Sequence, residues 1–569
     1  MKPLLTVSVL GVMSLFACLL SAGSQTPSRS AASPAPTDLA RGAYAVLEAH
    51  CGACHGEKAI GGFNFRSRAA MLQKEQIRTD HFERARVYLR AVLEEEGAMP
   101  PPSSHDTLTS AEKAALKAWI FAAAPEPPSA NAANAAAPQN EAVLLQRIEQ
   151  DLAHRPAEDR PFLRYFTLTS LVGSGATEAE ITAYRLGLSR LLNSLSWQPQ
   201  ITPPGAVDRL GSVLRIDLRR YGWSERSWQR LLDAYPYGVL RTSHAAQHIQ
   251  EMTRCDLAYL RADWFVAAAA VPPLYHDLLD LPASIQELEK RLNVALDQDV
   301  EQNRAARAGL QESGVSRNNR VVERHSTSYG AYWRSYDFQS NAGEQNIFTH
   351  PLTFVPSGGE IIFNLPNGLQ GYFLVDGRGN RIDDAPIAIV SNHANLTDPV
   401  VHNGLTCMSC HTQGMRRFTD ALRPTLLSAA GAADYERNAA LALYREPTQM
   451  NAFLDADTAR FVKAARETGA AAGFEEPLVA LQRRYASSLN LNQAAAELGL
   501  TPRELLARLS LAPDLRRALG ILQSEGGTVK RDAWEEIYGI FIEAFGGGSY
   551  RRPGASTILE SIKAVPNPN

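Results

Sequence analysis

The 569-residue chain has few cysteines, little net charge and no long apolar run beyond its beginning. A formal charge of −3 argues against a nucleic-acid partner, which would favour a strongly basic surface. No apolar run after the N-terminal residues is long enough to cross a membrane as a helix. Four of the six cysteines belong to one repeated motif, so no pair remains for a convincing disulfide.

That motif is Cys-x-x-Cys-His, at residues 51–55 and again at residues 407–411. Covalent attachment of haem needs two thiols that add to the two vinyl groups of one porphyrin, and a following histidine that ligates the iron. Cys51, Cys54, Cys407 and Cys410 are therefore predicted to attach haem. The expected cofactors are two covalently bound haem c groups.

Two other interpretations of the pentads are weaker. A thioredoxin-like redox pair or half of a zinc site would also use a Cys-x-x-Cys spacing. No second cysteine pair lies near either pentad, and neither is flanked by a strand–motif–helix pattern. The sequence therefore favours a dihaem c-type cytochrome.

The N-terminus predicts export from the cytoplasm. Lys2 is followed by an apolar run over residues 4–20 and then by small residues, which is the order of a secretory signal over residues 1–24. An uncleaved membrane anchor and a lipoprotein modified at Cys18 are the alternatives. Each of the three exports the chain, so we expect a periplasmic protein without a transmembrane span after cleavage, either soluble or tethered only by its N-terminus.

Composition divides the rest of the chain. We expect a disordered spacer over residues 25–36, a compact unit over 37–125, an Ala/Pro linker over 126–140 and a large haem-bearing unit over 141–569. Apolar periodicity predicts helices over much of the large unit, with strand patterns near residues 361–363 and 372–375 around a turn at 376–380. The predicted fold class is mainly α: a small helical haem domain over residues 37–125, then a mostly helical domain with a small β-hairpin or sheet insertion.

The smaller unit shows the order of parts of one haem domain. A helix with Leu39, Tyr44 and Leu47 on one face leads into the pentad, so His55 is the expected proximal ligand. Met99 follows in a Gly-Ala-Met-Pro-Pro-Pro run, where prolines of fixed φ hold a thioether with little entropy left to lose. Met99 is the predicted sixth ligand. A capping box from Thr109 to Glu112 then starts a closing helix.

This order resembles the class I cytochrome c fold, and residues 61–72 narrow the resemblance to the planctomycete-type cytochrome c domain family. The resemblance covers about 90 residues and implies His/Met ligation, which tends to raise a haem potential. Residues 215–219, 235–238, 332–337 and 364–371 resemble exported multidomain cytochromes that carry the same type of domain. That second resemblance implies an architecture and not a reaction.

His411 is the expected proximal ligand of the second haem, but its sixth ligand is not determined. No histidine follows His411, and Met415 is too near it in sequence to reach the opposite haem face. The distal ligand is therefore expected upstream. His325, which precedes an aromatic segment, ranks first among the candidates, and an open or water-bound iron is the alternative; the other candidates are His350, His393 and His402.

Electron transfer through haem, with an unidentified redox protein as partner, is the favoured function. A dihaem oxidoreductase of the peroxidase type, with an open second haem, is the alternative. A third class is a recognition module that uses the β-hairpin region. The sequence leaves open whether the chain is an enzyme.

Overall fold

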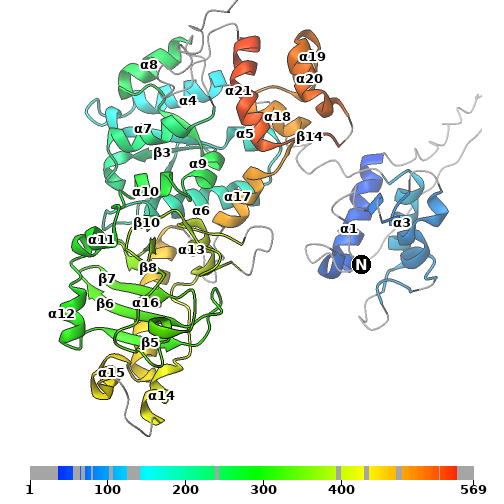
Figure 1. The fold of residues 1–569 in the computed structure, drawn as a ribbon. Helices are drawn as coiled ribbons and strands as arrows, with labels where there is room; N and C mark the ends of the chain where they lie inside the picture. The colour runs from blue at the N-terminus through cyan, green and yellow to red at the C-terminus, as the bar shows by residue number, and fades with distance from the viewer. Residues whose placement is uncertain are drawn as a thin grey trace, which may run out of the picture. The chain divides into compact units, whose positions relative to one another are not determined.

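The computed structural model describes residues 36–55, 65, 71–72, 74–78, 81–95, 97–101, 107–124, 141–237, 243–392, 399–428, 435–469, 477–524 and 526–546 (Figure 1). The chain divides into two compact units, Met1–Ala130 and Asn131–Asn569. The predicted signal at 1–24 lies outside the described residues, as do residues 126–140 of the linker and nearly all of the 25–36 spacer.

The N-terminal unit is built on two packed helices, α1 (Pro36–His55) and α3 (Ser110–Phe121). Leu47, Trp119 and Ile120 of these helices are buried in a core that the segment between them also lines, for example with Met71 and Ile77. Tyr44 of α1 meets the Trp119 ring edge-on, with ring centroids 5.6 Å apart. The predicted capping box is confirmed, since Thr109 and Glu112 exchange both hydrogen bonds. The short helices η1 (Phe82–Arg84) and η2 (Tyr88–Val92) lie between them in sequence.

The first part of the large unit mixes helices with a four-stranded sheet of order β2-β3-β1-β4. Helix α4 buries an apolar stripe of Leu144, Leu145, Ile148 and Leu152. Strand β1 interrupts the stretch predicted to be helical, pairing antiparallel with β3 and parallel with β4. The elements here are α4 (Glu141–Ala153), η4 (Arg160–Phe162), β1 (Leu163–Thr167), α5 (Thr169–Gly173), α6 (Glu178–Ser194), β2 (Gly205–Ala206), β3 (Val213–Asp217), η5 (Leu218–Tyr221), α7 (Glu225–Ala234), α8 (His244–Thr253), β4 (Tyr259–Arg261), α9 (Ala262–Ala268), α10 (Leu274–Leu278), α11 (Ile285–Leu292) and α12 (Leu296–Glu301).

A six-stranded antiparallel sheet of order β10-β9-β8-β7-β6-β5 forms the middle of the large unit (Figure 1). The prediction of a mainly α chain with a small sheet insertion is therefore wrong. The predicted strands and turn belong to β8, β9 and the β9–β10 connection, but three further long strands precede them. The elements are β5 (Ala306–Leu310), β6 (Arg320–Thr327), β7 (Gly330–Asp337), η6 (Gly343–Gln345), β8 (Gly358–Asn364), β9 (Gln370–Asp376), β10 (Arg381–Ile382), β11 (Asp384–Ala385) and β12 (Val401–His402).

Buried ion pairs explain why the sequences of β5, β6 and β7 do not show the alternation of apolar and polar residues that predicts a strand. Arg307 of β5 pairs with Glu323 of β6, and Arg320 of β6 pairs with Asp337 of β7, all with almost no exposed side chain. In a sequence, a charged residue predicts a solvent-exposed position. Here each charged side chain is buried because a neighbouring strand provides an opposite charge. The strand period is thereby masked.

The chain is helical again after the sheet. Helices α18 and α19 follow each other closely, and α19 begins with a Thr501–Glu504 capping box. Helix α16 packs Met450 and Leu454 against Trp333 of the six-stranded sheet. The elements are α13 (Leu405–Cys410), α14 (Leu422–Ser428), α15 (Arg437–Leu443), α16 (Pro447–Glu467), α17 (Leu478–Ala486), β13 (Leu489–Asn490), α18 (Leu491–Glu497), α19 (Pro502–Leu511), α20 (Pro513–Leu519), η7 (Gly520–Gln523), β14 (Thr528–Val529) and α21 (Arg531–Gly546).

Candidate functional site

The second pentad sits on the short helix α13 at a position that requires glycine in front of it. Gly404 has φ +89°, and a Cβ there would lie 2.5 Å from the Ala270 carbonyl oxygen and 2.9 Å from the Tyr275 ring. Only a residue without a side chain fits such an approach. The tight contact fixes where α13 begins and hence where the following cysteines point.

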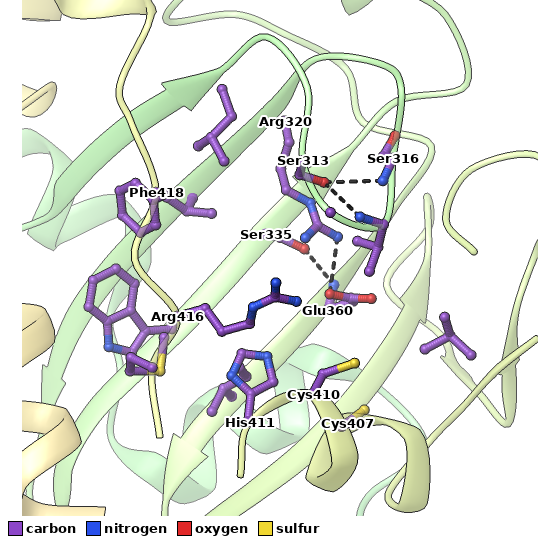
Figure 2. A pocket seen from close by; sticks show the side chains of 18 of the residues that line it. Ser313, Ser316, Arg320, Ser335, Glu360, Cys407, Cys410, His411, Arg416 and Phe418 are labelled. Carbon is purple, nitrogen blue, oxygen red and sulfur yellow. Dashed lines mark hydrogen bonds and ion pairs between the residues drawn. The ribbon is translucent and has the colours of Figure 1, made fainter. Parts of the chain in front are cut away.

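Cys407, Cys410 and His411 line a cavity of about 740 Å³, which falls within the usual size range of cofactor pockets (Figure 2). One wall is a face of the six-stranded sheet, and the loop before β6 and the segment after the pentad form others. The apolar and aromatic lining residues include Val322, Trp333, Ile362, Tyr372, Leu374, Met415 and Phe418. The polar lining residues include Ser313, Ser335, Glu360, Arg320 and Arg416.

His411 is held in the tautomer that a metal ligand needs. Its Nδ1–H donates to the Gly414 carbonyl oxygen at 3.0 Å. Because a carbonyl oxygen can only accept, the proton belongs on Nδ1 and the lone pair on Nε2. Burial lowers the pKa of His411 to about 4, so the ring is neutral at physiological pH.

The two thiols of this pentad are free and partly buried. Burial raises the pKa of both Cys407 and Cys410, so both are protonated at neutral pH. Two free thiols, an imidazole with an available Nε2 and an apolar wall fit a covalently attached haem. The residues that would hold it are Cys407, Cys410 and His411.

A buried ionic cluster lies along the sheet side of the same cavity. Arg320 donates to Asp337 and, at 3.0 Å, to Glu360, whose backbone N–H donates to Ser335 Oγ at 2.9 Å (Figure 2). Burial raises the pKa of Glu360 despite the neighbouring guanidinium. The cavity therefore combines an apolar wall with one fixed polar region.

The first pentad ends a long helix in the N-terminal unit. Cys51 packs against the core, Cys54 is exposed and His55 is partly buried as the last residue of α1. His50 is turned toward α3, where its Nε2 lies 3.1 Å from Glu112 Oε1. That contact ties the two helices together one residue before the motif.

Met99 lies partly buried in the same unit, on the connection that precedes α3. Its backbone N–H donates to the Arg90 carbonyl oxygen at 3.1 Å, after Gly97 has turned the chain with φ +78°. The structure therefore fixes the backbone of the loop that carries the predicted thioether. His81 is near Glu83 at the surface, and His105 lies outside the described residues.

The structure does not bring His325 to the second pentad, which corrects its prediction as the distal ligand. Successive residues of a strand face opposite sides of a sheet, so His325 of β6 faces away from Val322, which lines the cavity. Its Nδ1 lies 2.9 Å from Asp299 of α12, and its Nε2 lies 3.0 Å from Glu323. The pKa of His325 is raised by these carboxylates, which outweigh the desolvation that lowers it.

The other candidate distal ligands are also accounted for. His402 precedes α13, but its Nδ1 contacts Asp384 at 2.6 Å, and His350 contacts Thr349; neither lines the cavity. His393 lies outside the described residues. Met415 does line the cavity, and its sulfur accepts from the Gln370 side chain at 3.5 Å.

Sequence reasoning missed several residues that shape this site. Gly404 and Gly414, with φ +89° and +94°, set the start of α13 and the turn that holds His411. The Asn-Gly pair before the motif is a turn signal that could have identified the first of them. Arg320 and Glu360 gave no such signal, because their approach depends on pairing between distant strands.

Residues 38–120 match the family model described as cytochrome c oxidase, cbb3-type, subunit III. No curated protein and no solved structure gives a significant match to the chain. No helix in the described ranges is both long and apolar enough to span a membrane. The match is confined to the N-terminal unit, where it agrees with the Cys51–His55 motif at the end of α1. Residues 38–120 are thus a class I cytochrome c domain, which binds haem c covalently and supports haem-based electron transfer.

Proposed function

We propose that this chain is an exported dihaem c-type cytochrome that transfers electrons between redox partner proteins. The first haem is bound by Cys51, Cys54 and His55, with Met99 as its sixth ligand. The second is bound by Cys407, Cys410 and His411. Haem c supplies one-electron transfer at each site, and the protein holds the iron ligands and the surrounding dielectric.

The observation that carries the second site is the cavity at residues 407–411. A Cys-x-x-Cys-His pentad placed by chance would have no reason to border about 740 Å³ of partly apolar space. Nor would its histidine need Nδ1 bonded to the Gly414 carbonyl oxygen, which leaves Nε2 for a metal. Both features are expected of a haem-binding motif.

Haem counting tests the proposal directly. The full chain, produced in a host with intact secretion and haem attachment, should carry two acid-stable haems, measured as the pyridine haemochrome after acid extraction. A value of one would remove the second site from the proposal. The holoprotein should fractionate with the periplasm or its membrane face, and haem-free protein in the cytoplasm would contradict export.

A dihaem oxidoreductase with an open second haem is the second candidate. Two observations favour it. The cavity contains the polar groups of Arg320, Glu360 and Ser335, and His325 does not line it but contacts Asp299. Paramagnetic resonance separates the candidates. A low-spin second haem that does not bind cyanide or carbon monoxide supports the electron-transfer protein. A high-spin haem that binds them supports the oxidoreductase.

A further inference from the structure

The cavity beside the second pentad contains more positive than negative side chains. Its lining includes five arginines and two glutamates: Arg317, Arg320, Arg334, Arg416, Arg417, Glu312 and Glu360. Three of the arginines are neutralised. Arg320 pairs with Asp337 and Glu360, Arg334 with Glu289 at 3.4 Å, and Arg417 with Asp455.

Arg416 and Arg317 differ from these three. Within the parts of the chain that the structure describes, neither has an ion pair or a side-chain hydrogen bond. The Arg416 side chain reaches into the pocket from the segment after the pentad (Figure 2). Its guanidinium nitrogens lie 3.5 and 3.6 Å from the place of a Cβ on Gly314, in the loop that carries Arg317.

The position of Arg416 places its charge near the pentad itself. Arg416, His411 and Cys410 line the same cavity, and the Arg416 side chain extends into it on the side of Glu360 (Figure 2). Guanidinium groups bind carboxylates through two parallel hydrogen bonds, and a haem carries two propionate carboxylates on the edge away from its vinyl groups. A porphyrin attached through Cys407 and Cys410 would direct that edge away from the thiols and across the cavity.

We propose that Arg416, together with Arg317 on the facing loop, binds the propionate carboxylates of the haem attached at Cys407 and Cys410. This inference rests on the proposed second haem. The two cations fix the porphyrin edge opposite the thioethers and neutralise the propionates. A free small anion, such as formate or nitrite, is the other carboxylate-like ligand that the same guanidiniums could hold.

Redox titration of the full-length holoprotein tests the assignment. Arg416→Gln removes a cation near the iron and leaves a propionate unpaired, and both changes favour ferric haem. The equilibrium constant for reduction of the second haem should fall about tenfold, as a charge about 10 Å away in a partly shielded site predicts. That is about 59 mV for one electron. Arg416→Lys, which keeps the charge, should recover most of the loss.

Arg417→Gln is the matched control, because the adjacent guanidinium is already paired with Asp455 and Asn451. It should change the same constant less than twofold. If Arg416→Gln prevents folding, Arg317→Gln on the exposed loop provides the test, with an expected drop of severalfold. A holoprotein variant with full haem content and an unchanged potential in both cases overturns the assignment.

Two further measurements distinguish a failure of the proposed second haem from a failure of the propionate assignment. A wild-type chain without haem at residues 407–411 defeats the proposed second haem itself, before any arginine is tested. Millimolar formate or nitrite should leave the wild-type potential and spectrum unchanged. If either anion shifts them and Arg416→Gln removes the shift, the guanidinium binds a free anion, and the propionate assignment is overturned.

Discussion

The first pentad ends a helix of 20 residues, whereas the second occupies a helix of 6 residues set against a six-stranded sheet. In the first unit the core is built around two packed helices, and Cys54 is exposed at the end of one of them. In the second unit both cysteines and the histidine border a cavity that also contains buried charged side chains. The same five-residue motif thus occurs in a helical unit in one case and in a unit of helices and sheets in the other.

The difference shows what a short motif determines. The pentad specifies the covalent bonds and the proximal ligand. The surrounding fold specifies the polarity of the haem site, the access of solvent to it and the residues on the distal haem face. In the N-terminal unit the scaffold is one that a family model matches. In the large unit the buried polar cluster of Arg320, Ser335 and Glu360 comes from β6, β7 and β8, which the motif does not predict.

Removal of the cysteines gives the largest expected effect. Cys407→Ala with Cys410→Ala should lower the haem content from two to one per chain, because both thioether bonds are lost. Cys51→Ala with Cys54→Ala should do the same for the other unit. Cys255→Ala is the control and should leave two haems, counted by the haemochrome assay. Unchanged haem content in the first variant would show that residues 407–411 bind none.

The axial ligand of the first haem is the next test of the comparison. Met99→Ala should abolish the iron–sulfur charge-transfer band and lower the potential of that haem by on the order of 0.1 V, since axial ligands set potentials over about 0.8 V. Met415→Ala, in the second unit, should leave that band unchanged. A wild-type spectrum in the first variant would mean that another residue binds the iron.

Features that depend on neighbours in sequence could be predicted in both units. The Thr109 and Thr501 caps, the apolar stripe of α4 and the turn after Asp376 all follow from local patterns. Features that depend on strand pairing could not. Residues 320–327 contain two arginines, a glutamate and a histidine, and their burial depends on partners from β5, β7, α12 and α16.

The prediction for His325 failed for that reason. Without knowledge of β6, the aromatic residues after His325 looked like the wall of a haem pocket. Strand alternation instead divides them, so that Trp333 lines the cavity while Tyr332 lies beside His325, with ring centroids 6.0 Å apart. Because neighbouring residues of a strand face opposite sides of the sheet, a shift of one residue in β6 or β7 would change which side chains face the cavity.

Gly404 tests how strictly the sheet-bound scaffold positions its pentad. Gly404→Ala should lower the free energy of unfolding of the large unit by about 3–5 kcal/mol, from an unfavourable φ and an overpacked contact with Ala270 and Tyr275. Gly343→Ala is the matched control, because Gly343 also has positive φ (+57°) but no atom within 4 Å of its Cβ position. It should cost about 1–2 kcal/mol. Urea unfolding followed by tryptophan fluorescence measures both, and equal losses would contradict the steric argument.

The smallest expected effect concerns the capping box at the start of α3 in the N-terminal unit. Thr109→Ala should lower that unit's free energy of unfolding by about 1 kcal/mol, the usual cost of an N-cap loss. Thr501→Ala removes the same kind of box from the large unit and should leave the N-terminal transition unchanged.

The N-terminal cap should also make stability depend on pH. Hydrogen bonds from the Thr109 backbone and side chain, and then from His50, lower the pKa of Glu112 from 4.5 to about 2. A carboxylate with a depressed folded-state pKa stabilises the native state above its unfolded pKa, and that contribution is lost as the pH falls from about 4.5 toward 2. Urea titrations of the holoprotein, followed at the haem of the first unit, should therefore show a steeper acid loss in wild type than in Glu112→Gln. Parallel acid profiles would show that the Glu112 contacts do not contribute to folding in solution.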